Sequence, residues 1–440
     1  MVTKTQKISI SKKIGFWSST AFVTGNMIGS GIFLLPSTLA AYGGISLIGW
    51  ICSSLGAILL ALVFGHLGRL VPNSLGGPYA YARLGLGDFW GYLVAWGYWI
   101  SIWCTNAAIA VAFVGYLEVF IPSLKNNVTA SIGSGLFVIW FFTWINSKPL
   151  KTIAFVQVLT TLLKLAPILA MGFIGIFYIQ LDHFIVFNLS EESSFKAITI
   201  TTTATLFAYL GMESAAINSK QIENAENTIK KATITGTLIT IVTYILSSIA
   251  VMGIVPPELL SQSHAPFADA ASLFWGSQAR YIVAAGAIIA TLGALNGWIL
   301  IQGQIPLAAA QDQLFPQFFK RKNKNNAPFI GIVLSSILAT VVMSFRFSET
   351  LVNTFTFIMN LSTLSVITPY LLSAMSLIVL VRRKQIPSKS KKTILALLAI
   401  CFCIWVCFGM GKEVIFWGFI LILLGIPFYI YQTYFKKYQS

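Results

Sequence analysis

Two ionisable side chains lie inside long apolar segments of this sequence, where a charge is difficult to place. Lys164 lies in the run VQVLTTLLKLAP, and Glu213 lies in the run GMESA. A charged side chain at the centre of a membrane-spanning helix costs about 3 kcal/mol, so such residues are usually retained for a function. We expect Glu213 to take up a proton or to accept a hydrogen bond from a tyrosine. We expect Lys164 to supply a fixed positive charge or to shuttle a proton, unless it snorkels to an interface.

Glycine interrupts two of the apolar segments at corresponding places. The first segment contains Gly29, Ser30 and Gly31 within GNMIGSGIFLLP, and the sixth contains Gly211 two positions before Glu213. Glycine in a helix interior costs about 1 kcal/mol relative to alanine. Close packing by small residues accounts for the first cluster when it is taken alone. The sixth segment repeats the interruption five segments later, and such a pair predicts an inverted-repeat transporter with its site near the bilayer midplane.

A site between two broken helices can bind the head of an amino acid without any charged side chain. Unwinding at Gly29, Ser30 and Gly31 exposes backbone N–H groups at a helix N-terminus, which attract a carboxylate. The hydroxyl of Ser30 adds a further donor. Unwinding of the sixth segment leaves carbonyl groups free to accept hydrogen bonds from an α-ammonium group.

The composition places these residues in a membrane protein. The chain has 440 residues, of which 56% are hydrophobic and only 10% are charged. Soluble proteins are about 25% charged, so a soluble enzyme, a disordered chain and a disulfide scaffold are excluded. Segments long enough to span a bilayer are expected at 14–41, 45–68, 87–120, 130–147, 152–180, 196–217, 230–255, 278–304, 328–345, 350–380, 393–411 and 413–434. Residues 69–86 are expected as a short interfacial helix, and 256–277 as an outside loop.

The positive charges orient the chain in the membrane. Lys and Arg number 29 against 13 Asp and Glu, a bias that fits either nucleic-acid binding or cytoplasmic loops. With the N-terminus inside, all Lys and Arg lie in inside segments except Lys125, Lys164, Lys196, Arg280, Arg346 and Lys412. This distribution predicts cytoplasmic termini and a bacterial inner-membrane location, with the lipid bilayer as partner and no nucleic acid. No metal site or cofactor is expected, since the Cys and His residues form no ligand cluster.

Several motifs resemble those of the amino acid–polyamine–organocation superfamily, and most closely its basic amino acid/polyamine antiporters. They are GNMIGSGIFLLP (25–36), GGPYAYAR (76–83), Tyr98-Trp99 with Asn106, GMESA (211–215), NGW (296–298) and AAAQDQLFP (308–316). The resemblance implies an all-α integral membrane fold of 12 transmembrane helices. It comprises a 5+5 inverted repeat with helices 1 and 6 broken, plus two C-terminal helices. The whole chain, 1–440, is one domain with repeats at about 14–180 and 196–380 and extra helices at 393–434. Alternating access and a homodimer are also implied.

The resemblance assigns roles to individual residues. Together with Gly29 and Gly31, the implied substrate-binding residues are Asn26, Ser30, Tyr98, Asn106, Phe207, Trp298 and Ser362. Trp298 and Phe207 offer π-faces to a cation, although Trp298 is also open to interpretation as a packing residue. For Asn106 a helix–helix hydrogen bond is an equal alternative. The implied gating and proton-coupling residues are Glu213, Lys164, Tyr79 and Tyr370.

Two departures from the antiporter pattern affect the expected function. Phe207 stands where arginine/agmatine exchangers carry a tryptophan, and Lys164 stands where that branch carries an apolar residue. Sodium-independent members of the superfamily place such a lysine where sodium would tie the first span to the eighth. The leading hypothesis is exchange of a basic amino acid for its decarboxylated amine, arginine/agmatine before ornithine/putrescine or lysine/cadaverine. The alternative is a proton-coupled amino acid symporter. An enzyme is not expected, because it would need a cluster of catalytic carboxylates, His or Cys, and only Glu213 and Lys164 lie well inside the membrane.

Overall fold

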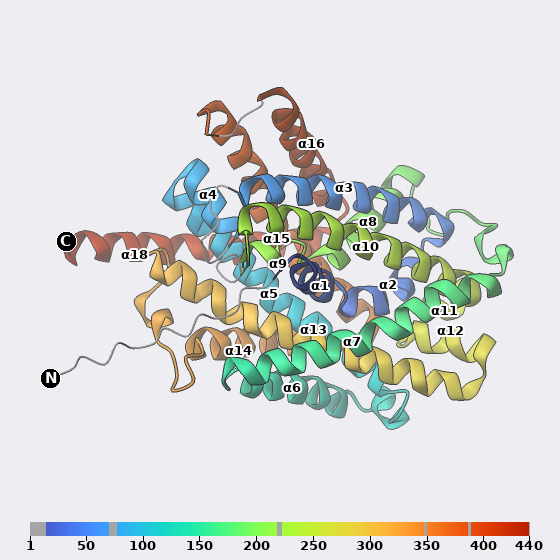
Figure 1. Cartoon of the computed structure of the whole chain (residues 1–440). Helices are drawn as coiled ribbons and strands as arrows, with labels where there is room; N and C mark the ends of the chain where they lie inside the picture. The colour runs from blue at the N-terminus through green and yellow to red at the C-terminus, as the bar shows by residue number, and fades with distance from the viewer. Residues whose placement is uncertain (1–14, 70–76, 218–221, 347–349, 386–388, 440) are drawn as a thin grey trace.

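The computed structural model describes residues 15–69, 77–217, 222–346, 350–385 and 389–439, which form an all-helical bundle (Figure 1). The α-helices are α1 (Phe16–Met27), α2 (Ser30–Ala40), α3 (Ser46–Leu67), α4 (Pro78–Leu86), α5 (Asp88–Leu117), α6 (Val128–Ile145), α7 (Leu150–Gly175), α8 (Ser194–Leu206), α9 (Ser214–Ile217), α10 (Ala225–Ile254), α11 (Pro257–Leu260), α12 (Pro266–Trp275), α13 (Ser277–Gln311), α14 (Phe329–Arg346), α15 (Leu351–Arg382), α16 (Lys389–Cys407), α17 (Lys412–Leu423) and α18 (Gly425–Gln439). Short 3-10 helices are η1 (Gly43–Ile45), η2 (Pro122–Asn126), η3 (Ile176–Tyr178), η4 (Leu181–Phe184), η5 (Phe207–Tyr209) and η7 (Gln317–Lys320).

Within the described residues, nine segments are long and apolar enough to cross a membrane. The predicted fifth and ninth spans contain the shorter apolar helices Ala166–Tyr178 and Phe329–Phe345. The predicted sixth span is divided into α8, η5 and α9, so no single helix of spanning length forms there. Large apolar side chains such as Phe137 and Ile282 are exposed, as lipid-facing residues are. The chain is therefore a multi-pass helical membrane protein, and twelve spans stay a prediction.

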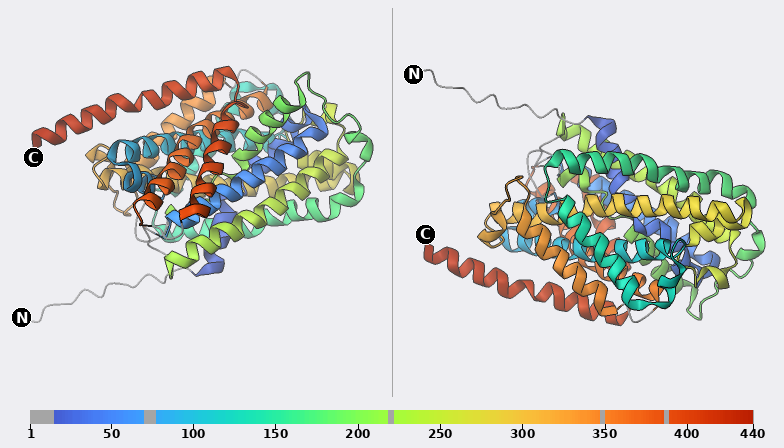
Figure 2. Two further views of the ribbon diagram at one scale, coloured as in Figure 1. Left: turned by 90° about the horizontal axis from the view of Figure 1, so that it is seen from above. Right: turned by 90° about the horizontal axis from the view of Figure 1, so that it is seen from below.

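The first predicted span lies at the centre of the bundle. Its α1 and α2 lie among α5, α10 and α13 (Figure 1), and most side chains of Phe16–Ala40 are buried. Few side chains of the final segment Lys412–Tyr434 are buried, and α18 extends away from the bundle (Figures 1 and 2). Gly25, Gly29, Ser30 and Gly31 thus lie in the buried part of this span, where helices meet.

One connecting segment differs from its prediction, and a second is described only in part. The expected loop at 256–277 contains α11 and α12, and Phe267 on α12 is fully buried with its ring centroid 5.2 Å from that of Phe33. Small residues on one face of α12 allow it to pack over α2. In the expected interfacial helix, residues 70–76 lie outside the described part. The remainder, α4, is packed against the bundle, since a Cβ on Gly85 would lie 2.7 Å from the Ser376 side chain.

Candidate functional site

The first predicted helix break is present between α1 and α2. Helix α1 ends at Met27, and Ile28 is extended with φ −73° and ψ 94°. Helix α2 begins at Ser30, so its first N–H groups have no carbonyl from an earlier turn to bond. Glycine on both sides of Ser30 permits close approach. A Cβ on Gly29 would lie 3.0 Å from that of Ala294, and one on Gly31 would lie 3.0 Å from Ala208 Cα.

The second break lies in the sixth predicted span and faces the first. Helix α8 ends at Leu206, the 3-10 turn η5 follows, and Leu210 is extended with φ −61° and ψ 137°. Gly211 then has φ +101°, which residues with a side chain rarely adopt. A Cβ at Gly211 would also lie 3.3 Å from Asn26 Cβ and 3.3 Å from the Trp298 ring. Glycine is therefore needed here for both backbone conformation and space.

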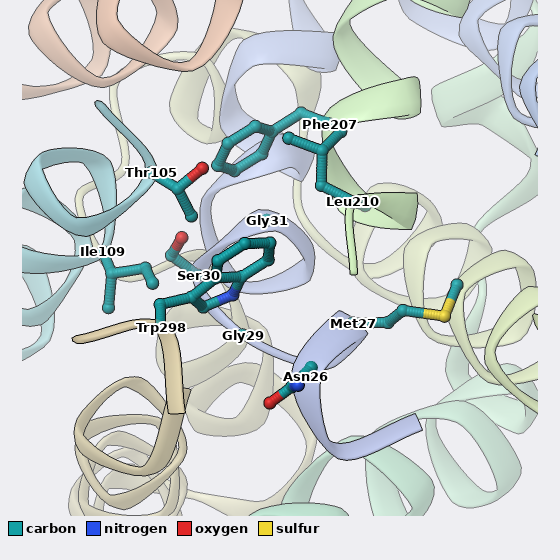
Figure 3. Close-up of a pocket in the computed structure, with 11 residues that line it drawn as sticks. Asn26, Met27, Gly29, Ser30, Gly31, Thr105, Ile109, Phe207, Leu210 and Trp298 are labelled. Atoms are coloured by element: carbon teal, nitrogen blue, oxygen red, sulfur yellow. The ribbon is translucent and has the colours of Figure 1, made fainter. Parts of the chain in front are cut away.

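A small pocket lies between the two breaks (Figure 3). It has a volume of about 10 Å³ and is lined by Asn26, Met27, Gly29, Ser30, Gly31, Thr105, Ile109, Phe207, Ala208, Leu210 and Trp298. That volume holds about one water molecule, so the breaks must separate before an amino acid can enter. Within the described residues, neither polar atom of the buried Asn26 amide has a hydrogen-bond partner. A buried amide without a partner, on a residue that lines a pocket, is available to a ligand.

Six predicted binding residues line this pocket, namely Asn26, Gly29, Ser30, Gly31, Phe207 and Trp298. Thr105 and Ile109 line it as well, although sequence reasoning singled out neither. They are four residues apart on α5 and therefore share a face, whereas Asn106 is turned by about 100° from Thr105. The spacing alone did not reveal which of the two neighbours, Thr105 or Asn106, faces the pocket.

Asn106 and Ser362 lie behind the pocket wall. Asn106 Nδ2 donates to Gln302 Oε1 at 2.7 Å, and Gln302 Nε2 donates to Ser336 Oγ at 2.8 Å. The alternative interpretation of Asn106, a helix–helix hydrogen bond, is thus the one observed. Ser362 is fully buried and pairs with Thr105 across 2.7 Å. Ser362 therefore supports Thr105 from behind and does not itself line the pocket.

Glu213 is held by two tyrosines directly beside the second break. The Tyr98 hydroxyl donates to Oε1, and the Tyr370 hydroxyl donates to Oε2 at 2.8 Å. All three side chains are buried. Tyr98 is therefore a partner of the carboxylate and does not line the pocket. The cluster joins α5, the sixth-span break and α15, so any movement of the break must change it.

Lys164, on α7, forms hydrogen bonds with the backbone at the first helix break. Its side chain is fully buried on α7, and Nζ donates to the carbonyls of Gly25 and Ile28, the latter at 2.9 Å. Burial overturns the snorkelling alternative. Both hydrogen bonds go to the end of α1 and its link to α2, whereas the resemblance implied a tie between the first and eighth spans. The ammonium therefore binds carbonyls released where α1 ends.

Tyr79 lies in a separate cluster at the end of α13. Its hydroxyl donates to Asp312 Oδ2 at 3.0 Å, and Arg83 lies 3.3 Å from the same oxygen. Burial, followed by the nearby Asp312 carboxylate, raises the pKa of the Tyr79 hydroxyl far above its usual value, so it remains a donor. Tyr79 thus links α4 to α13, and its predicted gating role would act at this contact and not through Glu213.

A second and larger cavity of about 550 Å³ lies beyond the end of α5, over α12. Four of its ionisable side chains form two pairs, and Lys125 lines it as well. Glu118 Oε2 lies 2.6 Å from His264 Nδ1, and Asp269 lies 3.2 Å from Arg280. Because these charges already have partners, the smaller pocket with its unpaired amide is the better candidate for the binding site.

A helical membrane bundle whose central, uncharged pocket lies between two broken helices has the architecture of a secondary transporter. The chain belongs to the amino acid permease family, whose sequence model matches residues 14–431. This is a family of membrane transporters, and not of enzymes.

Relatives of known description cover most of the chain. It is 32% identical to a putative arginine/ornithine antiporter of Bacillus subtilis, over 90% of this chain and 91% of the relative. It is 28% identical to the putrescine transporter PotE of Haemophilus influenzae, over 96% and 98%. It is also 33% identical to a cadaverine/lysine antiporter of Escherichia coli, over 76% and 75%. These similarities agree with the resemblance to basic amino acid/polyamine antiporters.

Proposed function

We propose that this protein exchanges a basic amino acid for a cationic amine across the membrane, with arginine and agmatine as the leading pair. The observation that carries the proposal is the uncharged pocket where the two helix breaks meet. The names of the relatives, which include arginine/ornithine and cadaverine/lysine antiporters, support exchange of cationic substrates. Exchange of arginine for the more highly charged agmatine moves net positive charge outward.

The pocket can bind the zwitterionic head of an amino acid through the backbone. The substrate carboxylate is placed at the start of α2, where the N–H groups that follow Gly29 are free of helical bonds. The α-ammonium is placed against the backbone of Ala208 and Leu210, where the 3-10 turn interrupts the α-helical ladder. Because both contacts are with backbone atoms, the head is recognised in any amino acid and the side-chain end must select among them.

Two aromatic faces are available to the cationic end of the substrate. Phe207 and Trp298 both line the pocket (Figure 3). A cation over such a face gains about 0.5–2 kcal/mol, less over phenylalanine than over tryptophan. Phe207 therefore supports a weaker contact than the tryptophan of arginine/agmatine exchangers would.

Transport follows from opening of the pocket on alternate sides. The pocket, about 10 Å³ in volume, is closed to an amino acid. The breaks on its two sides are held by Lys164 and by the Glu213 cluster. We propose that these two sites control movement of the breaks, and that protonation of Glu213 weakens its hold on the tyrosines.

The remaining architecture is proposed on the same basis. Residues 14–180 and 196–380 form two inverted repeats of five helices, and residues 393–434 add two more, for twelve spans. Both termini lie in the cytoplasm of a bacterium, with the chain in the inner membrane, and two copies associate as a homodimer.

A counterflow screen in proteoliposomes tests the proposed exchange. Vesicles containing the purified protein are loaded with agmatine, ornithine, putrescine, cadaverine, lysine or a neutral amino acid, and uptake of labelled arginine is followed at acid and neutral pH. The proposal predicts faster uptake with cationic loads than with empty vesicles. Uptake that is equal in loaded and empty vesicles contradicts it.

The buried ammonium of Lys164 favours a second candidate, a proton-coupled symporter, because a desolvated lysine can shuttle a proton. A pH gradient alone would then drive net uptake into empty vesicles, and Lys164→Ala would abolish it.

A further inference from the structure

The hydroxyl of Thr105 has an unusual hydrogen bond for a buried threonine in a helix. Thr240, Thr243 and Thr363 each donate to the carbonyl four residues earlier in their own helix. Thr105 instead pairs with Ser362 on α15 across 2.7 Å. Its side chain lies on the α5 wall of the pocket, with the hydroxyl turned toward Phe207 (Figure 3).

The direction of this hydrogen bond can be deduced from its neighbour. Ser362 Oγ donates to the Ser101 carbonyl at 2.9 Å. A hydroxyl has one proton, and a carbonyl can only accept. We therefore assign the proton of Ser362 to the Ser101 carbonyl, which makes Thr105 the donor in the pair with Ser362. With its proton assigned to Ser362, Thr105 Oγ1 is left as a hydrogen-bond acceptor on the wall of the pocket that Thr105 lines.

Thr105 thereby differs from the other polar side chains of the pocket. Asn26 and Ser30 can each donate or accept, and none of the described residues that line the pocket is charged. Among the polar side chains that line the pocket, Thr105 is the one whose role as a hydrogen-bond acceptor is set by its neighbours. It lies on α5, apart from the backbone groups of the two breaks that bind the substrate head.

We propose that Thr105 is a specificity-determining residue that selects substrates with an N–H donor on the side chain, such as an ammonium or guanidinium group. This role rests on the proposed exchange of cationic substrates and assigns their discrimination to one hydroxyl. A neutral isostere leaves the Thr105 lone pairs without a partner, and a side-chain carboxylate is repelled. A hydrogen bond to a charged group changes affinity about 10- to 150-fold, which sets the expected preference.

Competition in proteoliposomes measures this preference directly. Exchange of labelled arginine is inhibited with lysine or norleucine, and with ornithine or norvaline, pairs that differ by the terminal amino group. The variants are Thr105→Val, which removes the hydroxyl at constant volume, and Thr105→Ser, which restores it. Ser362→Ala removes the acceptor of the Thr105 hydroxyl, so Thr105 can then also donate a hydrogen bond into the pocket. Thr240→Val is the control, because Thr240 is buried and donates to its own helix at Gly236.

The inference predicts that Thr105→Val lowers the preference for the cationic member of each pair about 10- to 150-fold. Thr105→Ser and Thr240→Val should keep it, and Ser362→Ala should lower it by a smaller factor. An unchanged preference in Thr105→Val, or equal losses in the Val and Ser variants, overturns the role of Thr105. If Thr105→Val does not fold, an unchanged preference in Ser362→Ala overturns it. A wild-type protein that exchanges no cationic substrate instead overturns the proposed function itself.

Discussion

The buried cluster of Glu213 with Tyr98 and Tyr370 yields the sharpest prediction. Each carboxylate oxygen accepts one tyrosine hydroxyl, and the cluster adjoins the second helix break, part of which lines a pocket too small for substrate. A hydrogen bond to a buried charge contributes about 1.5–3 kcal/mol. If the cluster holds the closed state, Tyr98→Phe shifts the balance toward the open state about 10- to 150-fold. The apparent Kd for substrate then falls, because more protein is competent to bind.

A double-mutant cycle tests whether this effect passes through the carboxylate. Glu213→Gln keeps one acceptor oxygen but removes the charge, so the hydroxyl of Tyr98 can form only a neutral hydrogen bond, of about 1 kcal/mol. Tyr98→Phe should therefore change the apparent Kd less in the Gln background than in the wild type, with a coupling of about 1 kcal/mol. Substrate binding is measured by calorimetry on the purified protein.

A matched control is available on the same helix. Tyr92 is buried on α5, and its hydroxyl donates to the Gly425 carbonyl at 2.7 Å, away from Glu213. Tyr92→Phe should leave the apparent Kd unchanged. The reasoning is refuted if Tyr98→Phe weakens binding, or if its effect is the same with Glu and with Gln at position 213.

Three further predictions concern the contacts that hold the bundle around the pocket. Gly211→Ala forces an L-residue to φ +101°, which strains the backbone by about 1–3 kcal/mol, and should slow exchange at least tenfold. The control Gly411→Ala, whose Cβ would meet open space, should not slow exchange. Lys164→Met leaves two buried carbonyls without a donor, at about 1–3 kcal/mol each, and should lower both the thermal midpoint and the exchange rate. Because the lysine supplies the positive charge that a sodium ion would otherwise supply, the exchange rate of the wild type should be equal in sodium and choline buffers. Asp312→Asn breaks a partly exposed contact with Arg83 worth less than about 1 kcal/mol, and should change the exchange rate by less than about fivefold.

The sequence predicted the two helix breaks because glycine is rare in helix interiors and because lipid makes unpaired backbone groups costly. It also predicted that Glu213 would be functional or bonded to a tyrosine, since an isolated carboxylate in an apolar run needs a partner. Both predictions follow from local composition. The partners themselves, Tyr98 and Tyr370, lie on other helices, and no spacing rule identifies them.

The errors have a common physical cause. Asn106 and Thr105 are adjacent in sequence, yet only Thr105 faces the pocket, because one residue of helix rotation separates inside from outside. The direction of the Thr105 hydrogen bond depends on Ser362, which is distant in sequence. Likewise, the partners of Lys164 depend on where α1 ends. Helix rotation and the end point of a broken helix are set by packing, which composition does not specify.

The structure of the protein with bound arginine is the most direct test of the central claim. The account predicts arginine between the helix breaks, with its carboxylate at the N–H groups that begin α2 and its side-chain nitrogen near Thr105. The pocket must be wider than in the closed form, with Asn26 hydrogen-bonded. Arginine bound instead in the larger cavity with Glu118 and Asp269, with the helix breaks still closed, would contradict the account.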